Sequence, residues 1–274
     1  MDPMASPRMI QIASGKGGVG KTWLSVTLAE ALAGLGRNVL LFDGDLGLAN
    51  VDVQLGLSPQ LDLGSVIAGR ARFDEAITSY EIPSVSGDAG GVKFDVLAGK
   101  SGSGVLSALS KSEIAGMARA LAALSARYAH IITDLAAGLD QSVLSLCMPG
   151  STTLVVVTDE PTSLTDAYAF IKLLSQQDPH ADIRVVVNMA NDREHAWRTH
   201  AALTNACRNF LGINPPFAGF VPRDDMVRDA IRHQTPILFR HPQAKASEAV
   251  RKLARDLLFS IPQPAPKEAL RRGA

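Results

Sequence analysis

The residues with the clearest capacity for chemistry form one glycine-rich run near the N-terminus, Ser14-Gly15-Lys16-Gly17-Gly18-Val19-Gly20-Lys21-Thr22. Its spacing, Gly-x4-Gly-Lys-Thr, is that of a P-loop, in which glycines let backbone N–H groups turn toward phosphate oxygens. Lys21 is expected to reach the β- and γ-phosphates, and Thr22 to bind Mg²⁺. The expected nucleotide contacts are Gly15, Lys16, Gly17, Gly18, Val19, Gly20, Lys21, Thr22 and Trp23.

A second lysine in this run, Lys16, has no evident task in an ordinary P-loop, because Lys21 already serves the loop's own phosphates. Lys16 either neutralises a different negative charge or is a solvated loop lysine. The residues alone leave both readings open.

Three acidic residues, Asp43, Asp45 and Asp134, follow two apolar runs at 39–42 and 130–133. If these runs are parallel strands, their carboxyl ends meet at the edge of the sheet that holds the P-loop. The waters of a bound Mg²⁺ need carboxylate acceptors, and an attacking water needs a group that orients it. An aspartate at a strand end can also cap a helix. Together with the P-loop, the three acids favour a site that hydrolyses a nucleotide.

The elements that position these residues are read from continuous apolar, β-branched runs that alternate with helical patterns. Continuous runs are typical of strands buried on both faces, so the chain is predicted to be an α/β protein with a doubly wound, mainly parallel sheet flanked by helices. The expected strands are 9–13, 38–42, 92–97, 130–133, 153–157, 183–187 and 217–221. The expected helices include 23–34, 111–128, 162–176 and 193–210.

Length and composition predict one large domain. The chain has 274 residues, of which 46% are hydrophobic, enough for a sizeable core. We expect a single domain over residues 8–260 and a short, flexible, proline-rich tail over 261–274, with a second loose segment at 81–91.

Charge and cysteine content narrow the class of protein. The chain carries 27 basic and 27 acidic residues, and this balance argues against a nucleic-acid-binding protein. Its two cysteines form no CxxC pair, which fits a reducing cytoplasm and disfavours an iron–sulfur carrier. With no secretory leader and no long apolar run, membrane contact is expected only as peripheral attachment to the inner face of the cytoplasmic membrane.

The P-loop with its extra lysine resembles the deviant Walker A motif of the MinD/ParA ATPases. Segments 43–57, 155–168 and 186–190 resemble the flagellar-number regulators of the FlhG/FleN subfamily, which are MinD-like. The resemblance implies a P-loop fold that binds ATP or ADP with Mg²⁺ and forms a homodimer when ATP is bound. In that family the residue matching Lys16 reaches across the dimer to the partner's nucleotide.

The resemblance also implies roles for the acids. Asp45 would orient the hydrolytic water, and Asp43 and Asp134 would hold the waters of Mg²⁺. Asp166 would pair with Lys16 in the dimer. The sequence departs from the family after Asp134, where Leu135 follows, and this departure bears on switch II.

Two further positions are implied to bind the nucleotide base. Asn188 would contact adenine, and Pro222 would pack on the base. For Asn188, a turn residue at a strand end is the alternative.

The implied function is an ATP-dependent dimerising switch ATPase that regulates flagellar number or placement, with slow turnover stimulated by a partner. The implied partners are an FlhF-like GTPase, a flagellar basal-body component or a transcription activator. Two alternatives remain open: a ParA/MinD-type ATPase that positions DNA, cargo or the division site, and a nucleotide-sensing anti-activator module in which turnover is incidental. The extension that stimulates the GTPase in many FlhG proteins is not matched, because only eight residues precede Met9.

An apolar stripe near the C-terminus has two interpretations. Ala246, Ala249, Val250, Leu253, Leu257 and Leu258 recur at helical spacing. Such a stripe either attaches to lipid or packs on the domain, and its place within the resemblance favours packing. The last segment, 267–272, has a single large apolar residue, which is too little to hold a membrane alone.

Overall fold

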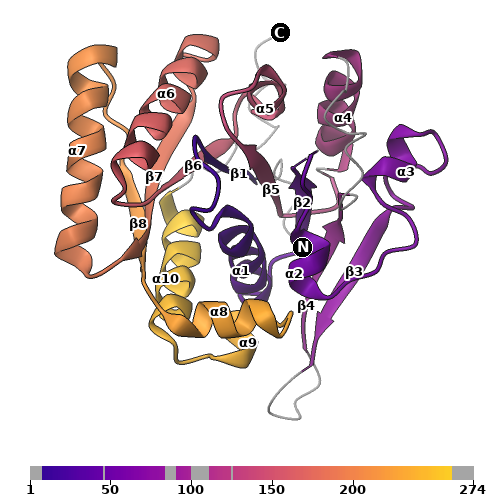
Figure 1. Ribbon diagram of the computed structural model, residues 1–274. Coiled ribbons are helices and arrows are strands. Elements are labelled where there is room, and N and C mark those ends of the chain that lie inside the picture. The colour runs from indigo at the N-terminus through magenta and orange to yellow at the C-terminus, as the bar shows by residue number, and fades with distance from the viewer. Residues whose placement is uncertain (1–7, 46, 84–90, 100–110, 125, 261–274) are drawn as a thin grey trace, which may run out of the picture.

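The apolar runs form one eight-stranded sheet with strand order β3-β4-β2-β5-β1-β6-β7-β8 (Figure 1). The structure is a computed structural model that describes residues 8–45, 47–83, 91–99, 111–124 and 126–260. Every described strand pairing is parallel except that between β3 and β4. The strands are β1 (Arg8–Ser14), β2 (Val39–Gly44), β3 (Ile77–Ile82), β4 (Val92–Leu97), β5 (His130–Ala137), β6 (Thr152–Val157), β7 (Asp182–Ala190) and β8 (Phe217–Pro222).

Helices cover both faces of this sheet, so each central strand is buried on two sides, as β2 and β6 are along their whole length. One apolar core joins the sheet to α4, α5, α6 and α7, and the other joins it to α1, α2, α9 and α10. The predicted doubly wound α/β architecture is confirmed. The helices are α1 (Lys21–Gly34), α2 (Val51–Leu55), α3 (Leu63–Ile67), α4 (Lys111–Leu124), α5 (Gln141–Leu146), α6 (Pro161–Gln177), α7 (Arg193–Leu211), α8 (Asp225–Arg232), α9 (Ile237–Arg240) and α10 (Lys245–Ser260).

The edge strand β3 was not predicted. It runs antiparallel to β4, and its side chains are mostly half-exposed, so it lacks a continuous apolar run. The segment predicted to be loose at 81–91 therefore begins inside β3, where Glu81 lies opposite Lys93. Residues 84–90 of that segment lie outside the described residues, as does the predicted tail 261–274. The predicted helix 111–128 is also too long, because α4 ends at Leu124.

The C-terminal apolar stripe is part of α10, which packs against α1 and β8 (Figure 1). Its residues Ala246, Val250, Leu253 and Leu257 are buried in the core shared with α1. The interpretation as a packed helix is confirmed, because the stripe already has a partner within the domain. Among the described residues, no helix combines the length and apolarity that a bilayer crossing requires.

Candidate functional site

The P-loop connects β1 to α1, as the motif requires. Gly18 and Gly20 have φ angles of 78° and 90°, in the left-handed region that favours glycine. A Cβ on Gly20 would lie 2.3 Å from Asn188 Nδ2, and a Cβ on Gly15 would lie 2.2 Å from the backbone oxygen of Asp166. Backbone conformation therefore favours glycine at Gly18 and Gly20, and close contact with neighbouring elements disfavours a side chain at Gly15 and Gly20.

Lys21 is buried at the start of α1 and lies within electrostatic reach of Asp134 and Asp45. Burial lowers the pKa of its ammonium group, and the charges of the two acids raise it. The structure thus brings the second P-loop lysine to the same edge of the sheet as the predicted acids.

Asp43 and Asp134 lie directly opposite each other on the paired strands β2 and β5, and both side chains are buried. Burial raises the pKa of both carboxyl groups, and the charge of Asp134 adds to the shift of Asp43. At Asp134 the opposing contributions come from hydrogen bonds with Thr22 and Ser25 and from the charge of Lys21. The Ser25 hydroxyl donates to Asp134 Oδ1 at 3.0 Å. Two buried carboxyl groups side by side favour a nearby cation, because its charge would offset the repulsion between them.

Both acids lie inside their strands and do not follow them as the sequence predicted. β5 runs on to Ala137 because β1 continues to pair with it, Ser14 against Ala137, and Gly138 N–H donates to the Ser14 carbonyl at 3.1 Å. Leu135, at which the sequence departs from the family pattern, is thus a buried residue inside β5.

Asp45 lies just beyond β2, with its side chain turned onto its own loop. Its Oδ1 accepts hydrogen bonds from Gly47 N–H at 3.2 Å and Leu48 N–H at 2.9 Å. Its backbone N–H donates to Asp43 Oδ1 at 3.1 Å. The loop that carries Asp45, the predicted water-orienting residue, is therefore hydrogen-bonded to the buried acid Asp43.

Lys16 lies in a different environment from Lys21. Its Nζ donates to Glu160 Oε2 at 2.5 Å and to Thr162 Oγ1 at 2.7 Å, both at the start of α6, and its side chain is 34% exposed. Within the described chain no ion pair joins it to Asp166, the partner that the resemblance implied across a dimer. Glu160 and Thr162 lie in the segment 155–168, which carried the resemblance, but no local pattern predicts their contact with Lys16.

The two predicted base-binding residues, Asn188 and Pro222, line one pocket of about 200 Å³ together with Trp23. The Asn188 side chain is tied to the P-loop, because its Nδ2 donates to the Val19 carbonyl at 2.7 Å. Residues of this pocket that the sequence did not predict are Met189, Arg223, Asp224, Asp225, Val227, Arg228 and Ile231. Most of them belong to α8 or precede it; Arg223 and Asp224 lie in the segment 221–224, whose resemblance to a base-packing loop singled out only Pro222.

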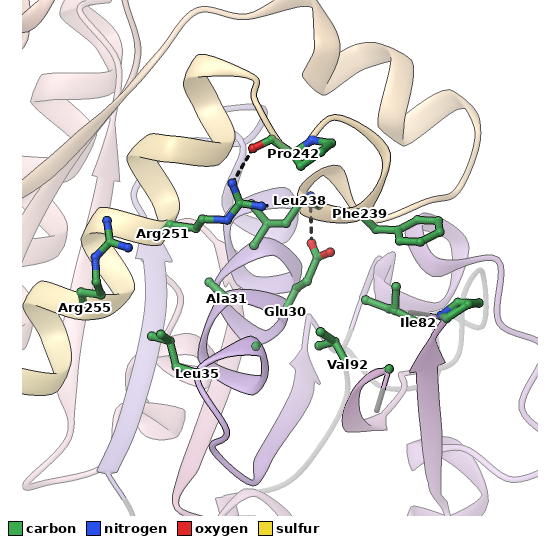
Figure 2. Close-up of a pocket in the computed structure, with 13 residues that line it drawn as sticks. Glu30, Ala31, Leu35, Ile82, Val92, Leu238, Phe239, Pro242, Arg251 and Arg255 are labelled. Atoms are coloured by element: carbon green, nitrogen blue, oxygen red, sulfur yellow. Dashed lines mark hydrogen bonds between the residues drawn. The ribbon is translucent and has the colours of Figure 1, made fainter. Parts of the chain in front are cut away.

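A larger cavity of about 470 Å³ lies away from this site, between α1, α10 and the β3–β4 edge (Figure 2). Its walls are mostly apolar, but Glu30 and Arg251 also line it. Glu30 is almost fully buried and accepts a hydrogen bond from Leu238 N–H at 3.1 Å. No residue of this cavity belongs to the P-loop, so we do not assign it to the nucleotide.

Comparison with known proteins agrees with this geometry. Residues 10–237 match the model of the CobQ/CobB/MinD/ParA nucleotide binding domain. The antiactivator FleN of Pseudomonas aeruginosa is 39% identical over 97% of this chain and 91% of its own length. The septum site-determining protein MinD of Pyrococcus horikoshii, solved with Mg-ADP, superposes with a TM-score of 0.74 at 25% identity and covers 92% of this chain and 96% of its own. MinD of Aquifex aeolicus, from a MinC:MinD complex, gives 0.72 at 28% identity, with 93% and 98% covered.

Proposed function

This chain belongs to the CobQ/CobB/MinD/ParA family of nucleotide-binding proteins, and we propose that it is an ATP-dependent dimerising switch that regulates flagellar number or placement. It is an ATPase that uses ATP and Mg²⁺, of the FlhG/FleN type. The observation that best supports the switch is that the two lysines of the P-loop differ in burial and in their partners. Lys21 is buried beside the acids of its own site, whereas Lys16 is half-exposed and bound to α6.

The acids and the P-loop fit a Mg²⁺–nucleotide complex. Asp43, Asp134 and the Thr22 hydroxyl supply hard oxygen atoms, which Mg²⁺ prefers. Within the described part of the chain, no three His, Cys, Asp or Glu residues gather as a metal-binding group. We assign Asp43 and Asp134 to the waters of Mg²⁺, and the Thr22 hydroxyl to the ion itself, when the nucleotide is bound. The bound cation would neutralise charge on the β- and γ-phosphates.

The chain's own residues divide the remaining tasks. Lys21, with its ammonium near Asp134 and Asp45, holds the phosphates from the inside of the site. Asp45 orients the attacking water, for which its carboxylate has to leave the turn that it forms with Gly47 and Leu48. This requirement fits slow turnover that accelerates when a partner rearranges the loop.

Lys16 is the residue through which nucleotide binding would depend on a second subunit. In the single chain its charge is balanced by Glu160. In a dimer it would exchange this contact for the partner's nucleotide and Asp166, which packs against Gly15 beside it. ATP favours the dimer only by its greater affinity for that state, and hydrolysis removes the bias.

The partners follow from the relatives. FleN is named an antiactivator, and Aquifex MinD was solved with MinC, so both of these relatives point to protein partners. For this chain we propose a transcription activator, an FlhF-like GTPase or a component of the flagellar base. Attachment to the inner membrane face would be peripheral, and the packed apolar face of α10 is not available for it.

The test is the solution mass of the protein with Mg-ADP and with Mg-ATP, measured by light scattering. Asp45→Ala prevents turnover, and Lys16→Ala is added in that background. Lys93→Ala is the matched control, since it removes another exposed lysine that pairs with a glutamate, Glu81, at 2.9 Å. We expect a dimer only with ATP, lost with Lys16→Ala and kept with Lys93→Ala. An ATP-bound monomer of the Asp45→Ala protein would refute the switch.

A further inference from the structure

Gln234, in the turn after α8, combines an unusual backbone with a long-range contact. Its φ angle is 50°, in the left-handed region that residues with a Cβ seldom adopt. Its side-chain Nε2 donates to the carbonyl of Val53 at 2.6 Å, a hydrogen bond between residues 181 positions apart. The backbone of this turn is that of a common helix C-cap, in which Gln234 N–H donates to the Ile231 carbonyl at 3.0 Å and Thr235 N–H to the Ala230 carbonyl at 3.1 Å. The feature that such a cap does not require is the contact of the Gln234 side chain with the Val53 carbonyl.

The acceptor of this bond belongs to α2, the short helix that follows the loop carrying Asp45. The N-terminal end of α2 is held by Asp43, whose Oδ2 accepts from Asn50 N–H and Val51 N–H at 3.1 Å each. The C-terminal end is held by Gln234, because the Gln234 side chain also packs against Gly56, where a Cβ would lie 3.4 Å from Gln234 Cβ. The helix that follows Asp45 is therefore bound at one end by a buried acid, and its other end is closed by backbone hydrogen bonds from Gly56 and Leu57 and joined to α8 by the Gln234 amide.

The donor of the bond follows directly after the wall of the base pocket. Val227, Arg228 and Ile231 of α8 line that pocket together with Pro222. Gln234 N–H donates to the carbonyl of Ile231 at 3.0 Å, so the turn is part of the same helical end. The turn therefore connects α8 to α2 through contacts that include no P-loop residue.

We propose that Gln234 is a positioning residue that ties the wall of the base pocket to the loop carrying Asp45, so that an occupied base pocket fixes α2 in place. The proposal rests on the proposed function only in taking the ligand to be an adenine nucleotide. The chemistry calls for an amide at this position. A glutamate would set a carboxylate oxygen against the Val53 carbonyl, and a glycine would relax the backbone but leave α2 untied.

The experiment compares Gln234→Gly and Gln234→Glu with Thr235→Ala. Thr235→Ala is the matched control. It removes a side-chain hydrogen bond of the same turn, from Thr235 Oγ1 to the His233 carbonyl at 2.9 Å, and this bond does not reach α2. Hydrogen exchange of amides 50–57 is measured with and without Mg-ADP, alongside the affinity for ADP and the steady-state rate constants.

In the natural protein and in Thr235→Ala, we expect Mg-ADP to slow exchange across α2. In both Gln234 variants we expect this slowing to fall by roughly two- to tenfold, the range for losing one hydrogen bond. ADP affinity and KM stay unchanged, and kcat falls by a similar factor.

The proposal is overturned if the variants keep the nucleotide-dependent slowing, or if they lose ADP affinity together with it. The exchange measurement uses ADP alone and needs no dimer. Failure of the ATP-dependent dimer would therefore refute the switch without touching this result, and a normal dimer with unchanged exchange would refute only the role of Gln234.

Discussion

Glu30 offers a prediction of stability with a calculable size. It lies on α1 with 3% of its surface exposed, on the wall of the larger cavity (Figure 2). Burial raises its pKa from 4.5 to about 7, while the N–H groups of Leu238 and Phe239 and the charge of Arg251 oppose the shift. The folded protein therefore holds a proton on this group at pH values where the unfolded chain has lost it.

The difference between the folded and unfolded pKa of Glu30 determines how this group changes the free energy of unfolding with pH. With the folded pKa above the unfolded one, the contribution to stability is fully present below about pH 4.5 and is lost as the pH rises through about 7. A shift of this size corresponds to about 3 kcal/mol at 1.36 kcal/mol per pKa unit. In Glu30→Gln the side chain keeps its shape and an oxygen that accepts from Leu238 N–H, but it has no charge to bury. We expect the variant to be more stable than the natural protein by up to about 3 kcal/mol near pH 8.

Urea unfolding at about pH 5 and pH 8 measures the effect as a difference between the two proteins. This difference cancels the titration of the other buried acids, such as Asp43 and Asp134. Glu81→Gln is the control, because Glu81 is an exposed glutamate on β3 whose pKa is lowered by Lys93. A Glu30→Gln protein that is equally stable or less stable than the natural one at pH 8 would refute the reasoning, as would a gain that is larger at pH 5.

Three more outcomes follow from the packing. Gly15→Ala should abolish binding of Mg-ADP in calorimetry, because its Cβ would meet the backbone oxygen of Asp166 at 2.2 Å; tight binding would show that α6 gives way. Cys147 and Cys207 are buried, which raises their pKa values to about 12 and about 11, so a thiol reagent at pH 8 should label them only in urea; rapid labelling of the native protein would contradict this. Leu253→Ala should lower the free energy of unfolding by about 2–4 kcal/mol, and a loss under 1 kcal/mol would show that α10 is loosely packed.

Local signals predicted most of the fold. The P-loop could be read from the sequence because its spacing, its preceding apolar strand and its following helix are contiguous. β3 could not, because Thr78, Ser79 and Glu81 give it a polar, half-exposed surface. Its strand conformation comes from pairing with β4, where Tyr80 and Phe94 place their ring centroids 5.3 Å apart. A strand that depends on its neighbour leaves little trace in its own residues.

The site shows the same division. That Asp43 and Asp134 lie close together could be predicted, because each follows a conspicuous apolar run. The contact of Lys16 with Glu160 could not, since it joins residues 144 positions apart and depends on where α6 begins. The tie between Gln234 and Val53 is of the same kind. Contacts between distant loops are set by how the elements pack, and spacing along the chain does not record them.

The exposure of the Lys16–Glu160 pair bears on how such a switch can operate. The two side chains are 34% and 60% exposed, and ion pairs this accessible to water contribute about 1 kcal/mol or less. This contact therefore cannot hold the protein as a monomer. The free energy that separates the two states has to come from the nucleotide, through its contacts in the dimer. To raise the dimer from about 1% to about 99% of the protein, ATP has to bind the dimer more favourably than the monomer by roughly 5.5 kcal/mol. The weak contact with Glu160 holds the Lys16 side chain at the start of α6 without opposing that shift, so in the proposed switch the loss of ATP by hydrolysis limits how long the dimer lasts.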